Sequence, residues 1–260
     1  MPRETPGSRA QQALARAIGT SPDAGDGVVD EPGEMPVAAT VVIARDTPRG
    51  PEVLLIERPD RGSFAGAWVF PGGKLDPIDR EGDATADDAD ELAARRAAVR
   101  EAREETGLVL DPDALVPISR WSPPPGVPLR ILTWFFVTRA PDDVSLDLAA
   151  DEAVSATWAR PADVLERHGR GELTLYPPTW VTLHELAGQS DVDDLLARAR
   201  LGGVHSYETL ARRGPSGPFM LWQEDAEYDA DAAAEASGSR ARARHRLTVG
   251  DLPWIYERSF

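Results

Sequence analysis

The strongest constraint on the fold is the change from short apolar runs to one long stretch of helix-forming residues. Residues 37–44 form an apolar, β-branched run that predicts a buried strand. A turn at 48–51 separates it from a second strand at 52–58, so the two are predicted to pair as a hairpin. Residues 90–106 are mostly Ala, Arg, Glu and Leu, and Gly107 suits a helix C-terminus. A long helix that follows paired strands indicates an α/β fold.

The same patterns predict the remaining elements. Further strands are expected at residues 67–70, 115–121, 129–138, 153–159, 219–222 and 246–249. Helices are expected at 161–168 and, from residue 178 onward, as a pair that divides near 188–191. The Asp-rich segment 75–90 and the Asp/Ala/Ser/Arg-rich segment 228–244 are predicted to be exposed loops.

Composition divides the chain into three parts. Residues 1–35 mix Pro, Gly, Asp and Glu with few large apolar residues, which predicts a disordered tail. Residues 36–200 carry the regular pattern and are predicted to form one folded domain. Residues 201–260 are less regular and are expected to pack on that domain as an extension. The extension could shape substrate choice or form a homodimer interface.

Charge and cysteine content exclude several classes of function. The 44 Asp and Glu against 28 Lys and Arg give a formal net charge of −16, which disfavours binding to nucleic acid or to an anionic membrane. The absence of cysteine excludes disulfides, thiolate zinc sites and cysteine nucleophiles. No signal sequence and no apolar run of about 18 residues is visible, so a cytoplasmic location is expected.

Three carboxylates recur at helical spacing near the end of the predicted helix. Glu101, Glu104 and Glu105 stand at i, i+3 and i+4, so they share one face. Like charges at this spacing repel, whereas Mg²⁺ accepts carboxylate oxygens together with water and substrate phosphate oxygens. A metal platform is therefore one interpretation. The other is a solvated helix face on which Arg100 or Arg103 neutralises the charges.

Two segments together resemble the Nudix box. Residues 70–74 read Phe-Pro-Gly-Gly-Lys, a strand end followed by a tight glycine turn, and the predicted helix supplies the second half of the pattern. The matching positions in that half are Arg100, Glu101, Glu104, Glu105, Gly107 and Leu108. Ala102 replaces a larger apolar residue of the family pattern.

The loop inside this box is longer than the family pattern. The interval from Gly73 to Arg100 is 27 positions against 14 in the family, so the loop carries 13 extra residues. Counted back from Arg100, the first glutamate of the family pattern falls on Leu92, with Glu91 adjacent. The inserted loop could contact substrate or metal, or it could be a solvated loop.

The resemblance implies a fold and a branch of the family. Segments 70–77, 98–107 and 176–179 are similar to the branch that contains peroxisomal coenzyme A diphosphatases and actinobacterial relatives. The implied fold is a Nudix-type α/β/α sandwich with a mixed, curved sheet, here followed by a C-terminal extension.

The resemblance also implies roles for individual residues. Glu101, Glu104 and Glu105 would ligate Mg²⁺ or Mn²⁺, and Arg100 would orient Glu101. A carbonyl of Gly73 or of the glycine before it could complete the coordination.

Substrate contacts and the general base are further implications of the same resemblance. Gly72 and Lys74 are expected to contact substrate phosphate. The base that activates water would be Glu101 or a carboxylate from a distant loop, for which Glu152 is the candidate. The four histidines show no metal-ligand spacing and receive no role.

The implied activity is Mg²⁺-dependent hydrolysis of a diphosphate linkage in a nucleoside diphosphate derivative. Coenzyme A or an acyl-coenzyme A is the preferred substrate, while ADP-ribose, nucleotide sugars and dinucleotides stay open. Two other classes are weighed against this enzyme. One is a non-catalytic Nudix module that binds a nucleotide and regulates a partner. The other is an acidic interaction protein whose helix only resembles the box.

Overall fold

The computed structural model describes most of the chain after its first 34 residues. The described residues are 35–61, 64–81, 89–125, 127, 130–142, 144–149, 151–229 and 243–260. The predicted tail thus lies almost entirely outside the described residues, as does most of the predicted loop 228–244. Among the helices that are described, none is long and apolar enough to cross a membrane.

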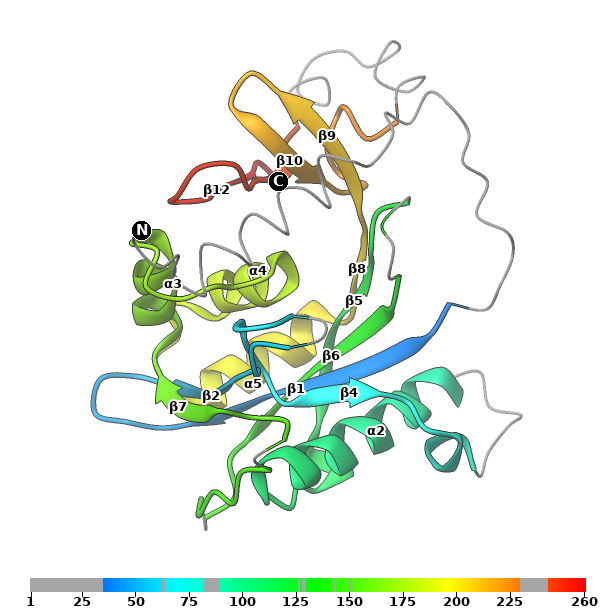
Figure 1. The fold of residues 1–260 in the computed structure, drawn as a ribbon, viewed down its shortest axis with the longest axis vertical. Helices are drawn as coiled ribbons and strands as arrows, with labels where there is room; N and C mark the ends of the chain where they lie inside the picture. Colours follow the sequence, from blue (N-terminus) through cyan, green and yellow to red (C-terminus); the bar gives the residue numbers. More distant parts are fainter. Residues whose placement is uncertain are drawn as a thin grey trace.

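A mixed sheet forms the centre of the described fold (Figure 1). Its path runs β3-β2-β1-β6-β5-β8, with β4 added beside β1 and β7 beside β2. Strands β1 and β6 are parallel, as are β5 and β8, and the other pairs are antiparallel. The strands are β1 (Val37–Arg45), β2 (Glu52–Glu57), β3 (Trp68–Val69), β4 (Gly72–Lys74), β5 (Val116–Ser122), β6 (Leu132–Arg139), β7 (Ser155–Ala159) and β8 (His205–Glu208).

Helices cover both faces of this sheet, so the predicted α/β sandwich is confirmed. One face carries α2 (Ala89–Thr106). The opposite face carries α3 (Pro161–Gly169), α4 (Pro177–Leu186) and α5 (Val192–Gly202). Two short 3₁₀ helices complete the layer elements, η1 (Pro77–Arg80) before α2 and η2 (Pro112–Ala114) after it.

Strand β1 illustrates how the apolar run divides between the two faces. Val41 and Ile43 belong to the core under α2, whereas Val42 and Ala44 belong to the core under α4 and α5. Successive side chains of a strand point to opposite faces, so a strand buried on both sides needs a continuous apolar run. Helix α2 faces this core with alanines, and such small side chains let its backbone lie close to the sheet.

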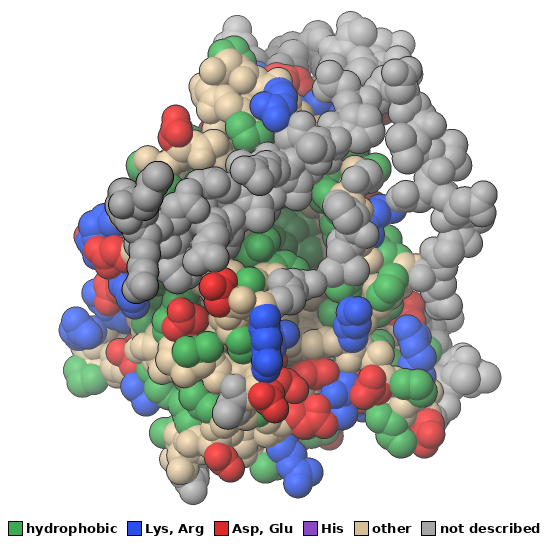
Figure 2. Space-filling view, in the orientation of Figure 1, with side chains coloured by type: hydrophobic (Ala, Val, Ile, Leu, Met, Phe, Trp, Pro, Cys, Tyr) green, Lys and Arg blue, Asp and Glu red, His purple; other side chains and the backbone are tan. Residues whose placement is uncertain are grey.

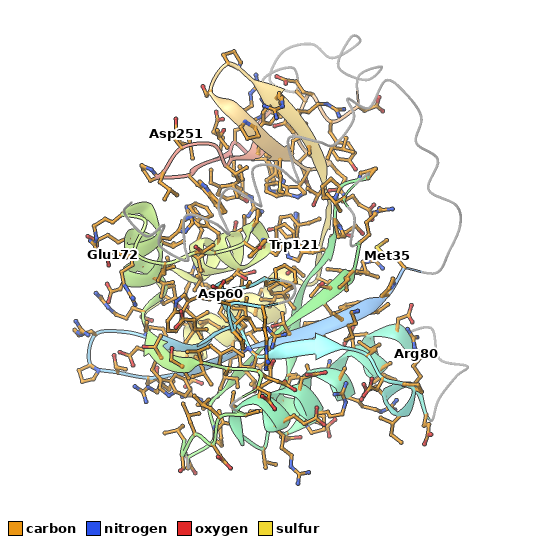
Figure 3. The ribbon with its side chains drawn as sticks, viewed as in Figure 1. Met35, Asp60, Arg80, Trp121, Glu172 and Asp251 are labelled. Carbon is orange, nitrogen blue, oxygen red and sulfur yellow. The ribbon has the colours of Figure 1, made fainter. Side chains whose placement is uncertain are left out.

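The C-terminal residues add a second sheet. Its order is β12-β11-β10-β9, and all its pairs are antiparallel. The strands are β9 (Leu210–Gly214), β10 (Gly217–Leu221), β11 (His245–Thr248) and β12 (Ile255–Arg258). Trp121 of β5, labelled in Figure 3, stacks on Tyr207 with ring centroids 3.8 Å apart and meets Trp222 edge-on. Aromatic packing of this kind joins the second sheet to the core under α4.

The elements with strong local sequence patterns lie where they are predicted, whereas four short strands are not predicted at all. The hairpin of β1 and β2, the helix that stops before Gly107 and the division between α4 and α5 near 188–191 are all present. Strands β4, β8, β9 and β12 are not predicted, because three to five residues rich in glycine or charge carry no clear alternation. Their strand form depends on a neighbouring strand.

Candidate active site

The glycine turn brings backbone directly against the acidic face of α2. Strand β4 pairs with β1, and the Thr40 hydroxyl donates to the Pro71 carbonyl over 2.7 Å, which fixes the turn before it. A Cβ atom on Gly73 would lie 2.4 Å from the carboxylate of Glu101, and one on Gly72 would lie 2.3 Å from the Ala39 carbonyl. Gly72 therefore needs glycine, because backbone atoms block a Cβ and its φ is +155°, whereas a Cβ on Gly73 would force the Glu101 carboxylate to move.

Glu105 is the buried carboxylate on the acidic face of α2. Its side chain is fully inaccessible to solvent, and its two oxygens accept from different partners. The Arg58 guanidinium donates over 2.5 Å, and the main-chain N–H of Gly72 donates over 2.8 Å. Burial nevertheless raises the pKa of Glu105 to about 7, because desolvation outweighs the two donors that favour the charged form.

Glu101 lies between the glycine turn and Arg100. The Arg100 guanidinium donates to its Oε1 over 2.8 Å. Burial raises the pKa of Glu101, Arg100 opposes that rise, and the neighbouring carboxylates of Glu104 and Glu152 add to it. Negative charge is thus concentrated here beyond what the arginine offsets.

Arg100 is held by a buried carboxylate that the sequence analysis did not single out. Its Nη2 and Nε atoms donate to the two oxygens of Asp79, over 2.8 Å and 3.3 Å, and Nη2 also donates to the Lys74 carbonyl. Asp79 is 3% exposed and lies in η1, inside the segment predicted to be an exposed loop. Neighbouring carboxylates raise the pKa of Arg100, so the guanidinium stays charged while it orients Glu101.

The chain returns to this site from a distant segment. The N–H groups of Asp147 and Ala149 donate to the carbonyls of Thr106 and Glu105, which have no partner within the helix because α2 ends there. The turn that follows carries Glu152, whose own N–H donates to the Ala149 carbonyl. The end of α2 thereby fixes where this loop passes.

Three carboxylates converge as a result. Glu101, Glu105 and Glu152 each offer an oxygen, and these oxygens all lie within 4.8 Å of one another. Glu101 is half-buried, Glu105 buried and Glu152 exposed, so the group is open to solvent on one side. Figure 2 shows acidic side chains gathered over α2, with Lys or Arg side chains beside them.

The other predicted site residues lie at the rim of this group. Glu104 is outside it: its side chain is 52% exposed and accepts from Arg100 over 2.9 Å. Lys74 is exposed on β4.

The carboxylates around this site outnumber the guanidinium groups. Asp79 and Glu101 contact Arg100, and Glu105 contacts Arg58, while Glu104 and Glu152 add two further negative charges. Hard divalent cations bind carboxylate oxygens, so both the donor set and the excess of negative charge fit such an ion.

This fold and this site define a class of protein. A family model described as the NUDIX domain matches residues 35–178, more than half of the chain. The chain therefore belongs to the NUDIX family.

Individual relatives agree with that assignment. A Caenorhabditis elegans protein named "Putative nudix hydrolase 7" is 26% identical over 203 residues, which cover 64% of each chain. The present chain thus spans somewhat less than two thirds of that relative's length. A crystal structure of a NUDIX hydrolase from Alicyclobacillus acidocaldarius is 26% identical and superposes with a TM-score of 0.56, over 64% of this chain and 97% of that one.

Asp79 and Arg58 are the site residues that the sequence analysis missed. Asp79 stands six residues after Gly73, which is where the family's first acidic residue falls when it is counted forward from the glycine. Counting back from Arg100 fails, because the 13 extra residues lie between the two. Arg58 follows β2 directly and carries no local signal, since only the tertiary fold brings it to Glu105.

Proposed function

We propose that this protein is a Mg²⁺- or Mn²⁺-dependent hydrolase that cuts the diphosphate linkage of a nucleoside diphosphate derivative. The observation that carries the proposal is the convergence of three carboxylates within 4.8 Å beside Gly73, where a Cβ atom would lie 2.4 Å from the Glu101 carboxylate. Membership of the NUDIX family supports the same reaction class. Two of the three carboxylates, Glu101 and Glu105, lie on α2 within the segment that resembles the Nudix box.

The residues present fit a hard divalent cation. Glu101 and Glu105 would hold it, with Glu104 at the rim as a further ligand and the backbone of Gly73 beside Glu101. The bound ion would offset the charge of the diphosphate and lower the pKa of a coordinated water.

Side chains of the protein would supply the remaining catalytic functions. Arg58 keeps the carboxylate of Glu105 fixed, and Arg100 keeps that of Glu101 fixed, so neither has to reorganise during the reaction. Glu152 is the exposed member of the group, which suits it to accept the proton of the attacking water. Glu101 is the alternative base, although its bond to Arg100 makes it a poorer proton acceptor.

Coenzyme A or an acyl-coenzyme A is the proposed substrate. Gly72 and Lys74 would contact its phosphates, since Lys74 is exposed at the rim of the site. ADP-ribose, nucleotide sugars and dinucleotides have the same linkage and remain the competing substrates. The domain limits at residues 35 and 200, a cytoplasmic location and a homodimer belong to the same proposal.

The decisive test is a screen for phosphate-bearing products with Mg²⁺ or Mn²⁺ present. Coenzyme A, ADP-ribose, NADH, nucleotide sugars and dinucleoside polyphosphates would each be incubated with the protein and with its Glu101→Gln variant. We expect turnover of at least one compound, dependent on the cation and lost in the variant. Turnover that survives both the chelator and the substitution would contradict the proposed site.

The screen also separates the enzyme from a non-catalytic module. A regulatory module would bind a nucleotide without cleaving it, which calorimetry with the same compounds detects. Binding without turnover in either cation would replace the enzyme with that module. The presence of Glu101, Glu104 and Glu105 together argues against this outcome, because a binding module has no need of all three.

A further inference from the structure

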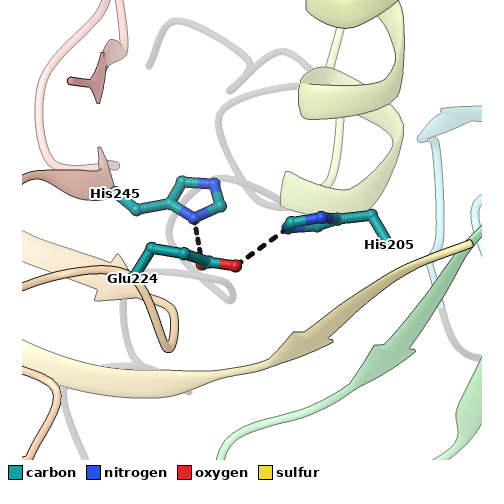
Figure 4. Close-up of side chains that lie close together, drawn as sticks. All are labelled: His205, Glu224 and His245. Carbon is teal, nitrogen blue, oxygen red and sulfur yellow. Dashed lines mark hydrogen bonds and ion pairs between the residues drawn. The ribbon is translucent and has the colours of Figure 1, made fainter. Parts of the chain in front are cut away.

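A second cluster of ligand-type side chains lies in the C-terminal part of the fold. Figure 4 shows His205 of β8, Glu224 after β10 and His245 of β11 facing one another. One ligand atom from each lies within 4.8 Å of the others. The cluster is outside the residues matched by the NUDIX model and far from α2 in Figure 1. It therefore needs an explanation of its own.

Glu224 bridges the two imidazoles unequally. One carboxylate oxygen lies 2.6 Å from Nδ1 of His245, a normal hydrogen bond. The other lies 3.6 Å from Nε2 of His205, beyond hydrogen-bond reach. Nε2 of His205 is buried and has no hydrogen-bond partner, although it points at the carboxylate. A buried nitrogen left without a partner costs free energy unless something else binds it.

The other ring nitrogen of His245 is already satisfied in a way that suits metal binding. Its Nε2 lies 3.0 Å from the Tyr256 hydroxyl, and that hydroxyl donates to Glu185 over 3.3 Å. Because the Glu224 carboxylate can only accept, Nδ1 carries the ring proton in the metal-free structure. An ion bound at Nδ1 would displace that proton and leave the ring proton on Nε2, which faces the Tyr256 hydroxyl oxygen. Ligating histidines commonly fix their tautomer through such a partner on the second nitrogen.

We propose that His205, Glu224 and His245 form a binding site for a divalent transition metal, with Zn²⁺ as the best-fitting ion. Two imidazole nitrogens and one carboxylate are a ligand set that zinc accepts, with a water in the fourth position. Imidazole nitrogens favour zinc over Mg²⁺, which prefers oxygen ligands. The site would thus be chemically distinct from the carboxylate group on α2.

The position of the cluster gives such an ion a structural consequence. His205 stands in the large sheet, where β8 pairs with β5, whereas His245 stands in the second sheet. An ion bound to both would tie the two sheets together. Because binding to the folded state alone raises stability by mass action, occupancy should be visible in thermal unfolding.

Metal content measures the proposal directly. The full-length protein would be stripped with a chelator, exposed to Zn²⁺ in the presence of excess Mg²⁺ to occupy the α2 site, dialysed and analysed by elemental mass spectrometry. We expect about one equivalent of Zn²⁺ and a melting temperature raised by roughly 5–10 °C at a hundredfold excess over Kd. The variant His205→Gln should lose both, and it should fold, because this side chain is partly exposed.

A matched control and a spectroscopic readout make the outcome unambiguous. His184 is an exposed histidine outside the cluster, so His184→Gln should retain the zinc. Co²⁺ bound to the cluster should give visible d–d absorption, which Glu224→Gln should weaken strongly. The proposal would be overturned if His205→Gln retained its zinc unchanged or if the unaltered protein bound no zinc. The cluster would then be a hydrogen-bonded structural contact.

Discussion

The buried carboxylate of Glu105 makes the stability of the metal-free protein depend on pH. Its pKa is raised from 4.5 to about 7 in the folded state because burial penalises the charged form. The folded state therefore binds more protons than the unfolded state between these values, and stability must fall as pH rises through this window. Below about pH 4.5 the stabilisation of the neutral form is fully present, and above about pH 7 it is lost.

The magnitude follows from the two pKa values. Integrating the proton linkage for this one group gives a loss of about 2.5 kcal/mol between about pH 5 and about pH 8. No discount for solvent screening applies, since the side chain is inaccessible. Glu105→Gln keeps the shape and cannot ionise, so this part of the pH dependence should disappear in the variant.

The assay is urea unfolding at a series of pH values with a chelator present. The curve of wild type minus Glu105→Gln reports Glu105 together with its electrostatic coupling to Glu101 and Glu152, because the titrations of more distant groups are shared. Glu104→Gln is the matched control on the same helix, and its half-exposed side chain should leave the wild-type slope in place. Equal slopes for wild type and Glu105→Gln would refute the reasoning. Adding Mg²⁺ to wild type should recover stability at the alkaline end, since the cation binds the ionised form.

The remaining predictions concern turnover by the proposed enzyme. Gly73→Ala should lower kcat/KM at least about 100-fold in steady-state assays, since the new methyl group displaces Glu101. The circular dichroism spectrum should stay unchanged. Wild-type rates would contradict the close approach of the Gly73 backbone to Glu101. Asp79→Asn should lower kcat about 10- to 100-fold by loosening Arg100, and an unaffected rate would reduce Asp79 to a structural role. Glu152→Gln should lower kcat about 100-fold or more with KM little changed, and an unchanged kcat would transfer the base to Glu101.

Local sequence was sufficient to predict the elements that carry the site. The apolar runs of β1 and β2, the helix formers of α2 and the stop at Gly107 each depend on neighbours within one or two turns. The common face of Glu101 and Glu105 follows from helical geometry alone. The glycine turn before α2 was visible for the same reason, because a backbone that must approach a side chain closely excludes every residue with a Cβ.

Only the tertiary structure decided which side chains complete that face. Glu152 arrives because a loop donates to the free carbonyls at the end of α2, and Arg58 arrives because β2 and β4 pair with the same edge of β1. Neither contact leaves a periodic trace in the sequence. Asp79 matches the family spacing when positions are counted forward from Gly73. It does not match when they are counted back from Arg100, because the inserted residues disturb that count.

The histidine cluster shows most clearly what the tertiary structure decides and the local sequence does not. His205 and His245 are 40 positions apart and belong to different sheets, so no spacing rule could join them. Sheet registers decide where each imidazole stands, and those registers depend on packing between segments distant in the chain. Periodicity in a sequence reports the neighbours along one element, whereas a site assembled from several elements is fixed by how their buried faces fit together.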